Sequence, residues 1–222
     1  MTYLIDRIDF VDNKLCEFCK RHLRTNIAYI LIKDGIEVPA GPSCAKKNGK
    51  NSGEKIPDFT KASFDVPEDD EVDQVRDGAN PVRGNIRARA PRPAGYHEVE
   101  YLRLRAEKLV RFNGAMFPKL KEIYLKYQTS GLDDTDITYL ERLIKKVSAD
   151  NPLLSPKNLQ NCYAYAFWLE RFLDKKGTNE FASSVLAQLQ QKLKLTEAQI
   201  VAINNWFQHI ERMPRLDTKA FL

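Results

Sequence analysis

Three of the chain's four cysteines lie close together near its N-terminal end. Cys16 and Cys19 form a C-x2-C pair, a spacing that lets two thiolates of one tight turn occupy adjacent corners of a tetrahedron. Cys44 follows in the sequence AGPSC, where Gly41 and Pro42 return the chain. A helix beginning there would favour the thiolate electrostatically. These residue types at these spacings predict a site for a thiophilic metal ion, with Zn²⁺ the first candidate.

The fourth ligand is less obvious from the sequence. In a treble-clef zinc site it usually follows the third ligand by about three residues, but Lys47 and Asn48 occupy those positions and neither ligates zinc well. His22 is the best substitute, and we predict one structural Zn²⁺ held by Cys16, Cys19, His22 and Cys44. Water would fill the fourth position if His22 did not, and reduced cysteines without metal are the alternative. Cys162 lies in an apolar helical segment and is predicted to be a core residue.

Basic residues surround the predicted metal site. Residues 14–55 hold nine Lys or Arg against four acidic residues, a local excess that can meet phosphates. Phe18 and Tyr29 either stack on nucleic-acid bases or pack inside the module. Contact with nucleic acid, contact with protein and a purely structural role all stay open. The residues predicted to contact DNA or RNA here are Lys20, Arg21, Arg24, Lys46 and Lys47.

The elements that position these residues are predicted to form an α+β chain. Residues 1–58 read as a small β module stabilised by zinc. Its segment IAYILIKDGIEVPA predicts two strands joined by a turn at Asp34-Gly35. Such a small module has little apolar core of its own, which favours metal.

A highly charged segment follows at residues 59–95. Its first half is acidic and its second half is basic, with Pro and Gly throughout. Such a composition buries too little apolar surface to fold, so we predict a disordered linker. The two halves either attract each other in a solvated tether or leave the basic half free as an arm for nucleic acid or an acidic protein. The cations of that arm are Arg83, Arg87, Arg89 and Arg92.

The remaining chain is predicted to form an all-α domain of two repeated three-helix units, residues 96–150 and 151–222. The two halves align at an offset of 63 residues, which places Gly114 on Gly177 and Ile137 on Ile200. Glycine is typical after a helix C-terminus, and LDDTD and LTEAQ are helix-start signals. Five aromatic residues crowd the segment from Tyr163 to Phe172, which indicates either a core shared by the units or a protein-binding surface.

Composition narrows the class of protein. The chain has 222 residues, 43% hydrophobic and 29% charged, with a net charge of +5. No apolar run approaches the roughly 18 residues of a membrane span, and acidic residues near the start argue against a signal peptide. We therefore expect a cytoplasmic protein with reduced thiols and no membrane partner. No motif of a nucleotide-binding loop, nucleophile elbow or catalytic zinc site is present in the sequence, which predicts a non-enzymatic protein.

Two motifs resemble proteins encoded in bacteriophage genomes, mostly of unassigned function. One is CEFCKRHL with AGPSCAKK, and the other is FASSVLAQLQQKLKLTEAQIVAINNWF; together they cover about a third of the chain. The resemblance implies a zinc-containing accessory protein near nucleic-acid processing, located in the host cytoplasm, with no catalytic residues. The expected partner is nucleic acid or a nucleic-acid-processing complex. The alternative is a protein-interaction factor, an inhibitor or adaptor that grips a host or viral complex through the helical repeat while zinc is purely structural.

Overall fold

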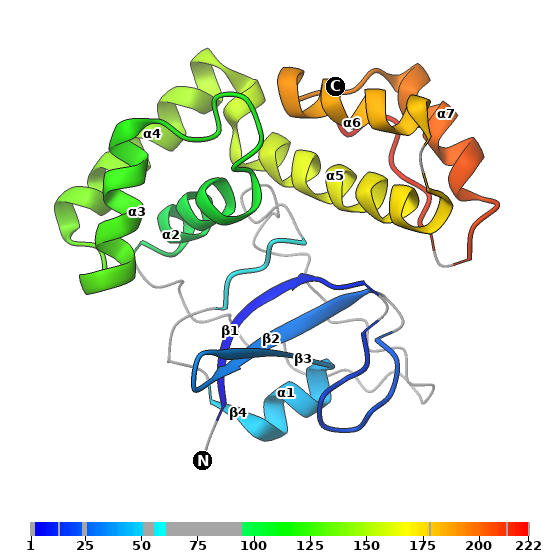
Figure 1. The fold of residues 1–222 in the computed structure, drawn as a ribbon. Coiled ribbons are helices and arrows are strands. Elements are labelled where there is room, and N and C mark those ends of the chain that lie inside the picture. The colour runs from blue at the N-terminus through cyan, green and yellow to red at the C-terminus, as the bar shows by residue number, and fades with distance from the viewer. Residues whose placement is uncertain are drawn as a thin grey trace, which may run out of the picture.

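The N-terminal part of the computed structural model is a small, curled four-stranded sheet (Figure 1), and the structure describes residues 3–12, 14–23, 26–50, 56–60, 95–177, 179–211 and 213–221. The strand order is β3-β2-β1-β4, with β1 antiparallel to β2 and parallel to β4. A short helix, α1, lies on the side of the sheet away from the other helices (Figure 1). The elements of this module are β1 (Tyr3–Phe10), β2 (Ile27–Lys33), β3 (Ile36–Ala40), α1 (Pro42–Asn48) and β4 (Gly49–Lys50).

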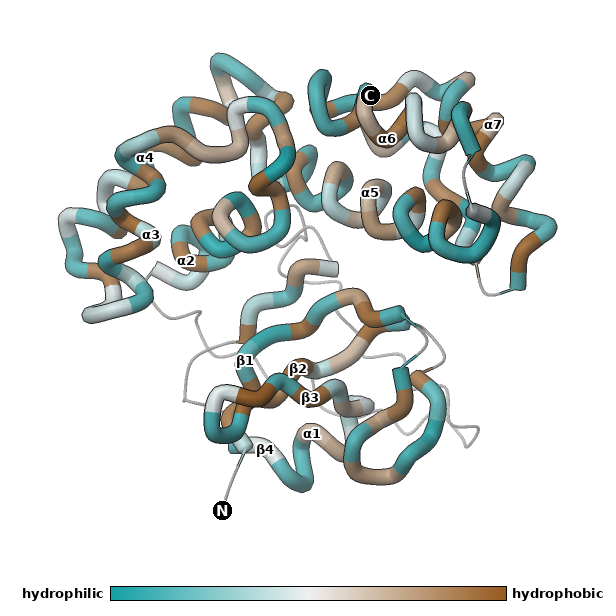
Figure 2. Tube along the Cα trace, viewed as in Figure 1, coloured by the Kyte–Doolittle hydropathy of each residue, from teal (hydrophilic) through white to brown (hydrophobic). Residues whose placement is uncertain are grey.

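The predicted hairpin at Asp34-Gly35 is confirmed. Both turn residues have positive φ, 52° and 78°, as a two-residue turn of this type requires, and Lys33 pairs with Ile36 across it. Hydrophobic and hydrophilic residues are interspersed along β1 (Figure 2), and its register with β2 shifts at a bulge between Ile5 and Arg7. Ile5 packs in the module core, whereas charged residues that follow it reach the helices.

Several helices follow from residue 96, so the predicted mixture of a small β module and an α-helical part is confirmed. Glu197, the first residue of α7, follows Asp134, the first of α4, by the predicted offset, and both helices begin with a capping box. Gly177 ends α5 as expected, but Gly114 lies in the turn beyond η1 rather than at a helix end. That the two sets of helices are structural repeats stays a prediction. The elements are α2 (Tyr96–Arg103), the π-helical η1 (Leu104–Lys108), α3 (Pro118–Ser130), α4 (Asp134–Asp150), η2 (Pro152–Leu154), α5 (Pro156–Lys176), α6 (Glu180–Lys192) and α7 (Glu197–Phe207).

Three clusters of buried apolar residues hold the fold together. The largest joins α2 and η1 to α5, α6 and α7, and takes in Tyr165, Trp168 and Phe172. The predicted explanation of the aromatic-rich segment, a core shared between the two sets of helices, therefore fits this packing. A second cluster lies inside the β module, and a third lies among α2, α3 and α4. No helix among the described residues is both long enough and apolar enough to span a membrane.

The β module packs directly against the helices. Phe10 of β1 stacks on Phe167 of α5, with ring centroids 4.9 Å apart. Phe59, which we expected to begin the linker, is completely buried in the largest helical cluster. The backbone N–H of Asp58 donates to Glu100 Oε1 at 3.0 Å. The segment 56–60 therefore anchors the module to α2, and the rest of the predicted linker, residues 61–94, lies outside the described residues.

A network of charged side chains fills the boundary between module and helices. Its centre is Asp9, 3% exposed, which accepts hydrogen bonds from Arg7 Nε at 2.9 Å and from the Tyr163 hydroxyl at 2.6 Å. Lys108 of η1 donates to the same carboxylate. Arg103 of α2 reaches Asp6 across the boundary at 2.9 Å. Because each carboxylate has cationic donors around it, these buried charges are compensated.

A second ionic contact lies farther along α5. Arg171 is 2% exposed and donates to Asn26 Oδ1 at 3.0 Å, while its Nη1 also forms an ion pair with Asp12. The guanidinium lies 5.6 Å from the centroid of the Trp168 ring, within the range of a cation–π contact. The module is thus fixed to the helical part at two separate points.

Replacing Asp9 by Asn tests this boundary. The substitution keeps the shape of the side chain but leaves the half-buried Lys108 without its carboxylate partner, and it removes one of the three carboxylates that surround Arg7. We therefore expect the free energy of unfolding to fall by about 3 kcal/mol. Chemical denaturation measures it. The matched control is Glu141→Gln, which removes an exposed partner of Lys145 and should leave the free energy of unfolding nearly unchanged. Equal costs for the two variants would contradict the central place of Asp9.

The lowered pKa of Glu37 makes the stability of the protein depend on pH. Hydrogen bonds from Arg7, at 2.8 Å, lower the pKa of Glu37 below its usual value. A carboxylate with a depressed pKa stabilises the fold above its unfolded-state pKa, and that contribution disappears as the pH falls through the folded-state value. We expect Glu37→Gln to be less stable than the wild-type protein near pH 7, and the difference to shrink as the pH falls and Glu37 becomes protonated in the folded protein. Denaturation at each pH measures it, and a pH-independent difference would contradict it.

Candidate metal centre

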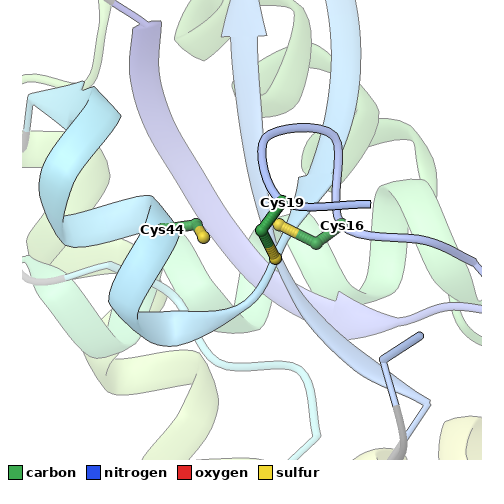
Figure 3. A group of neighbouring side chains, drawn as sticks. All are labelled: Cys16, Cys19 and Cys44. Atoms are coloured by element: carbon green, nitrogen blue, oxygen red, sulfur yellow. The ribbon is translucent and has the colours of Figure 1, made fainter. Parts of the chain in front are cut away.

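Cys16, Cys19 and Cys44 come together as the sequence predicted. Their three sulfur atoms lie within 4.8 Å of one another. Cys16 and Cys19 come from the loop between β1 and β2 and Cys44 from α1, and Figure 3 shows the three side chains converging. Cys16 is buried at 1% exposure, whereas Cys19 is exposed, so the group lies at the edge of the module core. Three sulfur donors at this separation could bind one metal ion.

The local backbone explains why the two cysteines of the pair face Cys44. A tight turn brings the N–H of Lys20 to the carbonyl of Cys16 at 2.9 Å, with Lys20 at a positive φ of 54°. The N–H of Glu17 donates to the carbonyl of Pro39 at 2.9 Å, and the N–H of Gly41 donates to Cys16 Sγ at 3.5 Å. The turn is therefore fixed to the end of β3, directly before the helix that carries Cys44.

The electrostatics of the group suit a cation. Burial opposes ionisation of Cys16, but hydrogen bonds from the backbone of Cys19, Gly41 and Phe18 outweigh it and lower the Cys16 pKa to about 7. Hydrogen bonds with Cys19 and then with Cys16 raise the pKa of Cys44 to about 11. Close thiols share protons because their negative charges repel, and a bound divalent ion removes that repulsion.

His22 is not among the side chains that the structure brings together at this group. Its backbone bridges to Leu15, while the N–H of Cys16 bonds to the carbonyl of Arg21. Directly opposed residues of an antiparallel pair point to the same face, and neighbouring residues alternate. The pairing therefore places His22 with the exposed Leu15, and Cys16 points to the other face. The spacing C-x2-C-x2-H could not reveal this because it says nothing of strand pairing.

The predicted basic residues that the structure describes lie on the two segments that carry the cysteines. Lys20 and Arg21 belong to the loop, and Lys46 and Lys47 to the last turn of α1; all four are exposed. Lys14 and Lys50 lie on the same two segments and are exposed as well. In the sequence they contribute to the local charge excess, but they are not among the predicted contacts. The remaining predicted contacts, Arg24, Arg83, Arg87, Arg89 and Arg92, lie outside the described residues.

No protein-family model matches the chain, and no curated protein and no solved structure matches it either. The resemblance to phage-encoded proteins stays a prediction.

The cysteine group predicts one metal ion per chain. We expect Zn²⁺ or the spectroscopic probe Co²⁺ to bind at a ratio near one, and Cys44→Ser to abolish binding because it removes the only sulfur donor from α1. The matched control is Cys162→Ser, since Cys162 is buried among the helices and contacts the carbonyl of Leu193 at 3.4 Å. Metal content after dialysis measures the ratio. Binding that survives Cys44→Ser would contradict the site.

Proposed function

We propose that the chain is a non-enzymatic accessory protein whose N-terminal module holds one structural Zn²⁺ and contacts nucleic acid, either DNA or RNA, alone or within a nucleic-acid-processing complex. The observation that carries this proposal is the segregation of charge within the module. The two segments around the cysteines, residues 14–23 and 42–50, hold six Lys or Arg and one acidic residue. One Zn²⁺ ion and three thiolates carry a net charge of −1, so a bound ion would leave most of the positive charge of these segments in place.

Most of these cations are free to meet phosphates. Lys20 forms an ion pair with Glu17 at 3.0 Å, but among the described residues Lys14, Arg21, Lys46, Lys47 and Lys50 form no ion pair. The acidic residues on the other side of the module are engaged instead: Asp6, Asp9, Asp12 and Glu37 all pair with Arg or Lys. Unpaired cations on one face are the electrostatic footprint of a nucleic-acid-binding surface.

The position of the cysteine group supports a structural role for the metal. Cys16 packs with Ile5, Leu31, Ala40 and Ala45 in a small core whose other apolar members are only partly buried. A metal ion there would cross-link the loop to α1 and so hold both basic segments in place. Within the described part of the chain, the group contains no carboxylate or imidazole that could act as a general base. Four free thiols suit a reducing compartment such as a cytoplasm, that of the host if the protein is phage-encoded.

The fourth ligand in this proposal is His22 or a water molecule. His22 would have to turn towards the sulfur atoms as the ion binds. His22→Ala decides between them: weaker Zn²⁺ binding at an unchanged ratio assigns the position to His22, and unchanged affinity assigns it to water.

A second candidate function rests on a different surface. Trp206 of α7 and Phe181 of α6 are 50% and 39% exposed and line a shallow apolar depression together with Phe172 and Phe207. Exposed aromatic residues are enriched where proteins bind proteins. In this alternative the helical part grips a protein complex, and zinc only stabilises the module.

Binding at low salt separates the two functions. We expect the zinc-loaded protein to bind fluorescently labelled DNA or RNA at about 50 mM salt and to lose most affinity by about 200 mM, because phosphate contacts release counterions. Cys44→Ser should weaken binding without changing any Lys or Arg, because the two basic segments lose their common anchor. Fluorescence anisotropy measures both. No binding to DNA or RNA at low salt would sink the nucleic-acid proposal and leave the protein-contact function.

A further inference from the structure

The aromatic side chains in the described part of the β module pack against other parts of the fold. None of those in the described part of the module is exposed: Tyr3, Phe10, Phe18, Tyr29 and Phe59. Phe10 and Phe59 pack against the helices, on the boundary already described. Phe59 is buried and the other four are half-buried, so the described part of the module presents no fully exposed aromatic ring on which a base could stack.

Phe18 lies between Cys16 and Cys19 in the sequence. Its ring meets that of Tyr3 edge to face, with centroids 5.2 Å apart and planes at 89°. Lys33 Nζ lies 5.5 Å from the centroid of the Tyr3 ring. Tyr29 packs against the same core. The stacking roles that the sequence allowed for Phe18 and Tyr29 are thus replaced by packing inside the module, and proteins that hold single strands depend on such stacking.

Cations dominate this surface: five exposed lysines and the exposed Arg21 lie on it, beside the exposed His22. The exposed cations lie on two segments that the cysteine group brings together, and residues 42–50 contain three lysines and no acidic residue. The amide of Asn48, which could read a base edge, donates to the carbonyl of Cys44 in its own helix at 2.9 Å. Lysine contacts to phosphates position a protein on nucleic acid but carry no sequence information.

We propose that this surface recognises the phosphate backbone of double-stranded nucleic acid and does not distinguish base sequence. The inference rests on the proposed function and names its substrate class. A duplex carries one negative charge per roughly 1.7 Å of its axis, about twice the linear density of one of its strands. A surface dominated by cations gains more from the denser charge, whereas a surface with fully exposed aromatic side chains gains more from unpaired bases.

The test compares three labelled probes with the full-length, zinc-loaded protein: two duplexes of unrelated sequence and one single strand taken from the first duplex. We expect both duplexes to bind with affinities within about two-fold of each other and several-fold more tightly than the single strand. Each phosphate contact contributes about −0.9 to the slope of log K against log salt, so four or five contacts predict a slope of about −4.

A charge-matched pair of variants locates the surface. Lys46→Ala with Lys47→Ala should reduce the magnitude of the slope by about two, one for each lost phosphate contact. The control is Lys145→Ala with Lys146→Ala, an equally exposed Lys-Lys pair on α4 that carries the same change of charge. It should leave the slope unchanged.

The outcomes distinguish the preference for duplex from nucleic-acid binding itself. Tighter binding of the single strand, or a loss of affinity in Phe18→Leu that retains its zinc and its fold, would overturn the inference while nucleic-acid binding stands. Equal effects of the two lysine pairs would overturn the assignment of the surface. No binding of any probe at low salt would overturn the proposed function itself.

Discussion

One buried carboxylate, that of Asp9, receives hydrogen bonds from both the β module and the helices. Asp9 lies where the sheet meets the helices, and its acceptors are shared by Arg7 from its own strand and by Lys108 and Tyr163 from the helical part. Apolar contacts such as that of Phe10 with Phe167 supply most of the attraction at such a boundary, but they are not directional. The ionic contacts determine orientation instead: a rotated module would leave charges buried and unpaired, at a cost larger than the gain from each pair.

The same strand arrangement links the boundary to the metal centre. Glu37 of β3 accepts from Arg7, which in turn donates to Asp9. A few residues later, Pro39 and Gly41 hold the turn of Cys16 by hydrogen bonds to Glu17 and to the Cys16 sulfur. The short strand β3 therefore carries an ionic anchor at one end and the support of the cysteine group at the other. The loop of the cysteine group is thus hydrogen-bonded to a strand that is itself tied to Arg7, which is how a group at the edge of a small core keeps a defined geometry.

Local signals in the sequence predicted local structure, and they failed where strand pairing or long-range contacts decide. The turn at Asp34-Gly35, the caps of α4 and α7 and the three converging cysteines all follow from residue types a few positions apart. The boundary could not be predicted in this way, since Lys108 and Tyr163 meet a residue that is 99 and 154 positions away. The burial of Phe59 has the same cause. His22 shows the other limit, because a ligand spacing fixes the reach of a side chain but not the face of the strand from which it starts.

Charged side chains have two opposite uses in this protein: some are buried in ion pairs between the module and the helices, and others are exposed around the cysteines. Arg7, Arg103 and Arg171 are almost completely buried in ion pairs, so their charges are neutralised inside the protein and do not contribute to any external field. The lysines near the cysteines are exposed, and repulsion among them would oppose their close placement unless the backbone fixed it. The cysteine group lies between the two segments that carry those lysines, so an ion that joins the sulfur atoms would also hold the repelling cations together. A structural metal can in this way set the charge density of a surface without touching what binds there.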